Sequence, residues 1–105
     1  MNSLQPEIAN RLIQFLNLDK DGRRRFVLKA ILKAGKITVS TLYKAANERY
    51  DTSPRVVASL LGYICSKLGI LRAYKKSYRL PTVYVLREDY ADLVRLTLEI
   101  TANKS

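Results

Sequence analysis

Six basic residues lie between positions 54 and 81, a stretch of the chain that contains no acidic residue. A second basic stretch, residues 19–36, carries seven bases and two acids. Flexible cations gathered on part of a folded chain are suited to contacting the phosphates of a nucleic acid. These two stretches are therefore the first candidates for a functional surface, and the chemistry that they offer is binding.

The stretch Arg72–Arg79 combines bases with two tyrosines and is predicted to form a hairpin with Tyr78 at its tip. We expect this hairpin to contact the DNA backbone, and an arginine at its tip suits a narrow minor groove. The alternative is a solvated hairpin at a sheet edge, where lysines prevent edge-to-edge pairing of strands. The residues predicted to bind DNA here are Arg72, Lys75, Lys76, Tyr78 and Arg79.

A helix-turn-helix is predicted between Ser40 and Leu68. Ser53 followed by Pro54 is a typical helix start, with a capping side chain and then a proline in the first turn. A short turn makes the two helices cross, which leaves the second one free to lie in the major groove of DNA. The predicted DNA-binding residues of this second helix are Arg55, Ser59, Ser66 and Lys67.

The face of that second helix opposite its apolar stripe is made of small residues behind one arginine. Two explanations remain open at this stage: the face enters a groove of DNA, or it packs against a neighbouring helix of the same domain. Arg55 is the one long polar side chain in the first half of the helix, so extensive recognition of base edges is not expected. The face consists of Arg55, Ala58, Ser59, Gly62, Cys65 and Ser66.

The composition excludes several classes of chemistry. The 105 residues include no histidine and one cysteine, which excludes a histidine-dependent catalytic site, a clustered His/Cys zinc site and an internal disulfide. Cys65 has no base to activate it and is expected to be structural. Residues 19–22 resemble the start of a calcium loop, but arginine and alanine stand where later ligands are needed, so Asp21 is expected to cap the next helix. We expect no enzyme activity, no metal and no cofactor.

Hydrophobic periodicity predicts an α+β fold that is mainly α. Between the first and last helices the order is helix, strand, helix, helix, strand, strand. This is the order of a winged helix-turn-helix, a three-helix core with a small antiparallel β-hairpin as its wing. We expect one domain over residues 1–105, with its winged-helix core at 23–86. The predicted helices are 5–17, 23–34, 40–50, 53–68 and 88–102, and the predicted extended segments are 36–39, 70–76 and 82–86.

In two segments, Leu18–Leu28 and Val57–Leu71, the chain resembles a family of small archaeal proteins of uncharacterised function that are thought to bind DNA. More broadly, it resembles winged helix-turn-helix proteins. The resemblance implies a recognition helix at Ser53–Leu68 and a wing at Arg72–Leu86. The wing loop departs from the usual pattern because it has no glycine and ends in Leu80-Pro81, so its tip is expected to be less extended.

Both terminal helices carry apolar stripes, which we expect to form a homodimer with two recognition helices about 34 Å apart, one turn of DNA. The alternative is that the two helices pack on each other and on their own core, giving a monomer. Contact with the DNA backbone is also expected from the predicted helix at residues 23–34. The predicted dimer residues are Ile8, Leu12, Phe15, Leu93, Leu96 and Ile100, and the additional backbone contacts are Arg23, Arg24, Arg25 and Lys29.

The sequence therefore predicts a dimeric transcriptional regulator whose partner is double-stranded DNA. Two alternatives remain: a winged-helix module that binds RNA or a partner protein, and a chromatin-type DNA binder with little sequence preference. The first residues show no basic segment followed by an apolar one, and no apolar run reaches the roughly 18 residues of a membrane span. We therefore expect a cytoplasmic protein without a membrane partner.

Overall fold

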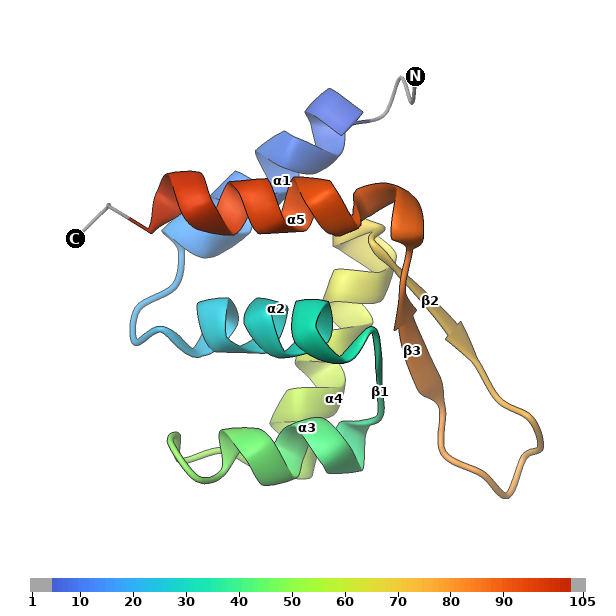
Figure 1. Cartoon of the computed structure of the whole chain (residues 1–105). Helices are drawn as coiled ribbons and strands as arrows, with labels where there is room; N and C mark the ends of the chain where they lie inside the picture. Colours follow the sequence, from blue (N-terminus) through green and yellow to red (C-terminus); the bar gives the residue numbers. More distant parts are fainter. Residues whose placement is uncertain (1–4, 103–105) are drawn as a thin grey trace.

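The computed structural model describes residues 5–102 of the chain, which form a mainly helical α+β fold, as the sequence predicts (Figure 1). No helix within these residues is long and apolar enough to cross a membrane. The elements in chain order are α1 (Gln5–Asn17), α2 (Arg23–Ala34), β1 (Lys36–Ile37), α3 (Val39–Ala46), α4 (Pro54–Tyr63), the π-helical turn η1 (Ile64–Leu68), β2 (Leu71–Tyr74), β3 (Val83–Leu86) and α5 (Glu88–Thr101).

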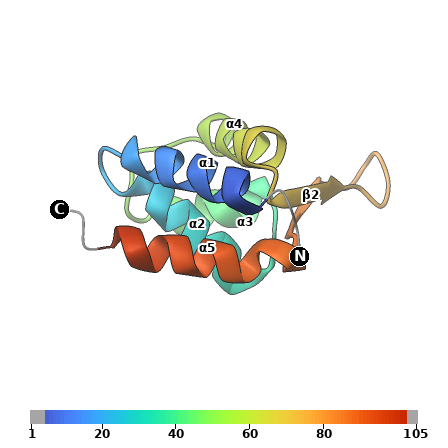
Figure 2. The ribbon, with the colours of Figure 1, turned by 90° about the horizontal axis from the view of Figure 1, so that it is seen from above.

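Helices α4 and α5 lie on opposite sides of the molecule, with α1 and α2 between them (Figure 2). The three strands form an antiparallel sheet in the order β1-β3-β2, in which Val85 of β3 is paired with Lys36 on one side and Arg72 on the other. The β2–β3 hairpin projects from the helical body in both views (Figure 1 and Figure 2). The fold thus offers two protruding surfaces, the outer side of α4 and the hairpin.

One apolar core takes side chains from all five α-helices and from the sheet. Helix α1 contributes Leu12 and Phe15, and α5 contributes Tyr90 and Val94, none of them more than 2% exposed. The core of residues 23–86 is therefore continuous with both terminal helices. Helix α2 is apolar around most of its circumference and packs against α1, α3 and α5, so it needs both terminal helices to cover it.

The start of α2 explains the calcium-like segment. Both carboxylate oxygens of Asp19 accept backbone N–H groups of the first turn, from Arg24 at 3.0 Å and Arg25 at 3.1 Å. Asp21 accepts the N–H of Arg23 at 3.0 Å. The N-cap is Gly22, in a left-handed conformation (φ 87°), and not Asp21 as expected. Asp21 precedes the cap and accepts one N–H of the first turn, whereas Asp19 accepts two.

Helix α3 differs from its prediction at both ends. Its N-cap is Thr38, whose side chain accepts the N–H of Thr41, so Ser40 lies inside the first turn and is not the cap. The helix ends at Ala46 and not near Tyr50. The ring of Tyr50 instead packs edge-on against Phe26 of α2, with 5.6 Å between ring centres, which directs the chain back towards α4.

Helix α4 begins as predicted, with Ser53 as N-cap and Pro54 in the first turn. Its predicted core stripe, Val57, Leu61, Ile64 and Leu68, is buried. The last turn widens into the π-helical segment η1, which the sequence did not predict, and it ends at Gly69 (φ 76°). Short π segments inside longer helices are frequent at functional sites, which draws attention to the surface around this turn.

Candidate nucleic-acid interface

The outer side of α4 and η1 carries the small-residue face expected from the sequence. Arg55, Ser59 and Ser66 are exposed on it. Gly62 lies among them, and a Cβ built at this position would have no heavy atom within 4 Å beyond its own helix backbone. No neighbouring helix covers these residues, so packing within the domain is not the explanation of this part of the face. The helix backbone is open to a partner here.

Cys65, from the same set, belongs to the fold. It is half-buried, and its Sγ donates to the backbone carbonyl of Leu71 at 3.5 Å, where β2 begins. Ala58 is half-buried, as Gly62 is. Cys65 connects η1 to the hairpin, which is the structural role expected for it.

The β2–β3 hairpin exposes every residue predicted to bind DNA in it: Arg72, Lys75, Lys76, Tyr78 and Arg79. Strand β2 ends at Tyr74, however, and not at residue 76 as predicted, so Lys75 and Lys76 lie in the loop. The tip is a defined turn, in which Leu80 N–H donates to the Ser77 carbonyl at 3.1 Å and Arg79 N–H donates to Ser77 Oγ at 3.2 Å. Lys75, Lys76 and Arg79 therefore lie within one short loop whose turn is fixed by hydrogen bonds.

The cations of α4 and the hairpin form no ion pair within the described residues. The ion pairs among residues 5–102 join Arg11 to Glu7, Arg23 to Asp21, and Arg95 to Asp92, and none of them includes a base of residues 54–81. Arg72 has acidic neighbours nevertheless, because it lines a hollow together with Glu88 and Asp89 at the start of α5. Exposed cations that form no ion pair raise the local potential and attract polyanions.

The three successive arginines at the start of α2 have a different role from the one predicted. Arg24 lies with its guanidinium 4.6 Å from the centre of the Phe15 ring and donates to the Phe15 carbonyl near the end of α1, at 3.2 Å. Arg25 donates to the Leu98 carbonyl at 2.9 Å and to Thr101 Oγ1 at 2.6 Å, in the last turn of α5. Both side chains are half-buried. They stabilise the fold by donating to backbone carbonyls that the ends of α1 and α5 leave without a partner in the helix.

Arg23 also binds within the chain. Its Nη2 donates to the Asp51 carbonyl at 3.3 Å, just before α4, and its guanidinium lies 5.6 Å from the centre of the Tyr50 ring. The three arginines thus reach α1, α5 and the loop before α4 from one helix turn. All three are half-buried and held by contacts within the chain, and Lys29 is the exposed residue of the predicted set. Arg23 and Arg24 also line a hollow with Ser59 of α4, so their contact with DNA stays a prediction.

The predicted dimer residues divide in a similar way. Ile8, Leu12 and Phe15 of α1 are at most 4% exposed inside the core of their own chain, so they are not available to a second copy. The set predicted on α5 is also partly misplaced. Leu93 is half-buried, whereas Leu96 and Ile100 are 53% and 56% exposed. Of the predicted dimer residues, Leu96 and Ile100 of α5 are therefore the ones exposed to a partner.

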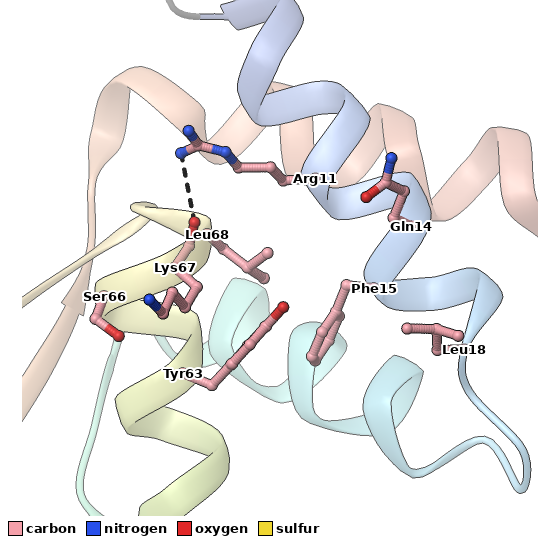
Figure 3. Close-up of a pocket in the computed structure, with 8 residues that line it drawn as sticks. All are labelled: Arg11, Gln14, Phe15, Leu18, Tyr63, Ser66, Lys67 and Leu68. Atoms are coloured by element: carbon pink, nitrogen blue, oxygen red, sulfur yellow. Dashed lines mark hydrogen bonds between the residues drawn. The ribbon is translucent and has the colours of Figure 1, made fainter.

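A pocket of about 370 Å³ separates α1 from the end of α4 and η1 (Figure 3). The Phe15 and Tyr63 rings stack between the two helices, with 5.9 Å between their centres and planes 18° apart. Arg11 reaches across and donates to the Lys67 carbonyl at 3.4 Å. The lining contains no acidic residue, and Arg11 also pairs with Glu7 at 4.0 Å.

Sequence reasoning did not single out the residues that extend the open face of α4 towards α1. These are Val56 and Tyr63, which are 43% and 46% exposed, and Arg11 and Gln14 on the other side of the pocket. A signal for Tyr63 was present, because it falls outside the core stripe of its helix. The contribution of α1 depends on tertiary packing and leaves no local pattern.

The similarity of this chain to known proteins covers most of its length. A family model described as "Protein of unknown function (DUF2551)" matches residues 12–94. An uncharacterized protein of Archaeoglobus fulgidus is 38% identical over 94 residues, which cover 89% of this chain and 94% of that protein. No solved structure matches the chain significantly.

Proposed function

This chain belongs to the DUF2551 family of proteins of unknown function, and we propose that it is a winged-helix protein that binds double-stranded DNA as a transcriptional regulator. Helix α4 is the proposed recognition helix and the β2–β3 hairpin the proposed wing. The element order α2-β1-α3-α4-β2-β3 and the antiparallel sheet β1-β3-β2 are compatible with that arrangement.

One observation carries the proposal: the six bases of residues 54–81 are distributed over α4, η1 and the hairpin, and none of them has an ion-pair partner within residues 5–102. Gly62 supports it, since a glycine inside a helix costs stability and nothing in the described fold requires one there. Close approach of a DNA groove to the helix backbone would explain why a glycine stands at this position.

The main test is binding of a mixed-sequence duplex followed by fluorescence anisotropy as salt is raised. Each phosphate contact contributes about −0.9 to the slope of log affinity against log salt, so several contacts cost orders of magnitude between about 50 and 200 mM salt. No measurable duplex binding at the lower salt would overturn the proposal. Salt-insensitive binding to another macromolecule would favour a protein-interaction module, and preference for RNA would favour an RNA-binding module.

A DNA binder with little sequence preference is the second candidate, and the make-up of α4 favours it. Serine and glycine surround Arg55 on the open face, whereas a helix that reads several base edges presents several long polar side chains. Selection of bound duplexes from a random pool distinguishes the two candidates. A regulator enriches a defined site, and a chromatin-type binder returns the pool unchanged.

A homodimer is proposed through α5, where Leu96 and Ile100 form the exposed apolar surface. This surface carries both signs of charge, since Arg95 pairs with Asp92 at 2.6 Å, so two copies meet there with less repulsion than at the basic side. Because α4 and α5 lie on opposite sides (Figure 2), two copies joined at α5 would present their α4 surfaces outwards. Such a dimer would hold two duplexes, not two half-sites of one duplex as the sequence suggested.

A further inference from the structure

We propose that Tyr78 at the tip of the hairpin stacks on a nucleobase, and that the protein therefore prefers DNA containing unpaired bases, such as a junction of duplex and single strand, over an uninterrupted duplex. This inference rests on the proposed DNA binding and specifies the form of DNA that the hairpin recognises.

The exposure of Tyr78 is the first observation. It is 83% exposed, more than any other large apolar side chain in residues 5–102, and the next is Leu18 at 65%. The aromatic pairs of the described residues lie elsewhere, in Phe15–Tyr63 and Phe26–Tyr50. A face of the Tyr78 ring is thus left for a partner. Every base has a π-face, and stacking of bases on aromatic side chains is a common way to bind unpaired nucleotides.

The surroundings of the ring are the second observation. Arg79 holds its guanidinium 5.7 Å from the centre of the Tyr78 ring and donates from Nε to the Tyr78 hydroxyl at 3.4 Å. Lys75 and Lys76 precede it in the same loop. A ring in contact with one cation, in a loop that carries two more, fits a ligand that is flat and aromatic on one side and anionic on the other. A nucleotide has both properties.

The shape of the hairpin is the third observation. The loop projects beyond the helical body (Figure 2), and the hydrogen bonds of Leu80 N–H and Arg79 N–H to Ser77 fix its turn. The tip can therefore reach into DNA while α4 remains on the duplex. In the interior of an uninterrupted duplex both faces of each base are covered by neighbouring bases, so the ring gains a stacking partner only where the stack ends or is broken.

The test compares two DNA probes, a blunt duplex and the same duplex with a single-stranded extension that carries 2-aminopurine at the first unpaired position. Affinities come from anisotropy, and stacking on the unpaired base is read from the quenching of 2-aminopurine fluorescence. The variants are Tyr78→Ala, which removes the ring, and Tyr78→Phe, which keeps it. Leu80→Ala is the matched control, because Leu80 lies in the same loop and is 47% exposed but has no π-face. Far-UV circular dichroism verifies that each variant is folded.

We expect the wild type to bind the junction roughly fivefold or more tightly than the blunt duplex, since one base stacked on an aromatic side chain is worth about this much. Tyr78→Phe and Leu80→Ala should keep the preference and the quenching, and Tyr78→Ala should lose both. Equal wild-type affinity for the two probes overturns this inference and leaves the proposed DNA binding intact. Absence of binding to either probe overturns the proposed function itself.

Two further results also decide the question. If Tyr78→Ala weakens binding to both probes equally, the ring is a general contact to the duplex and the preference for unpaired bases is refuted. If Leu80→Ala abolishes the preference and Tyr78→Ala does not, an aliphatic wedge between base pairs replaces aromatic stacking, and the inference is also refuted.

Discussion

Replacing Arg25 with alanine should unfold the protein at much lower temperature without changing how its DNA binding depends on salt. The side chain joins the first turn of α2 to the last turn of α5, by hydrogen bonds to the Leu98 carbonyl at 2.9 Å and Thr101 Oγ1 at 2.6 Å. Because its guanidinium is half-buried and engaged within the chain, it has little to offer a phosphate. The variant therefore tests whether Arg25 stabilises the fold or binds a phosphate of DNA.

The expected loss follows from the two bonds. A hydrogen bond from a charged group contributes about 1.5–3 kcal/mol. A cation at a helix C-terminus adds about 0.3–1 kcal/mol. Since the site is only half-buried and water can partly replace the lost donor, we expect a total of about 2–3 kcal/mol in the free energy of unfolding. For a domain of this length that lowers Tm by roughly 10–20 °C.

The assay is urea and thermal unfolding followed by far-UV circular dichroism, combined with the salt titration of duplex binding below the unfolding temperature. Lys29→Ala is the matched control, because Lys29 is an exposed base one turn further along α2. It should change stability by no more than about 0.5 kcal/mol. If Arg25→Ala keeps the wild-type Tm and reduces the salt slope by about 0.9, Arg25 is a phosphate contact and the structural explanation is wrong.

Three further predictions concern the two proposed interfaces. Gly62→Gln should raise the free energy of unfolding by about 0.5–1 kcal/mol, since it adds a better helix former in open space. It should also weaken duplex binding on the order of tenfold, because the longer side chain would keep a DNA groove away from the helix backbone. Wild-type affinity in this variant would argue against a groove at this position. Arg55→Ala should reduce the discrimination between DNA sequences by about 1–3 kcal/mol. Arg79→Ala should lower the affinity for all duplexes alike and reduce the salt slope by about 0.9. Identical titrations for both variants would mean that the DNA-binding face is wrongly placed. Leu96→Glu should convert a dimer into a 12.0 kDa monomer in sedimentation equilibrium, and a wild type that already sediments as a monomer at micromolar concentration would refute the dimer.

Local chemistry made much of this fold predictable. The cap and proline at Ser53-Pro54, and Gly35 and Gly69 just past two helix ends, mark boundaries by backbone physics that needs no tertiary context. The core stripe of α4 was also predictable, because helical periodicity alone separates it from the open face. The same reasoning identified every exposed cation of the hairpin.

Tertiary packing determined what the sequence did not reveal. A run of three arginines has the same appearance whether it faces DNA or neighbouring helix ends, and only the positions of Phe15 and Leu98 in space distinguish the two cases. The apolar stripe of α1 likewise suits a partner subunit or its own core equally well. Leu98 of α5 is buried while Leu96 is exposed, a difference that depends on how the helix is rotated against α1.

The position of β2 at the edge of the sheet has a consequence for solubility. One side of this strand pairs with β3 and the other has no neighbour in the sheet, so its free backbone groups are a template on which another strand can add. Arg72 in the strand, with Lys75 and Lys76 in the loop just beyond its end, places like charges at that edge, and repulsion between them opposes the joining of two copies of the chain there. The cations proposed to bind DNA therefore also act as gatekeepers against aggregation. A variant stripped of several of them is expected to precipitate, and light scattering should precede any measurement of its affinity.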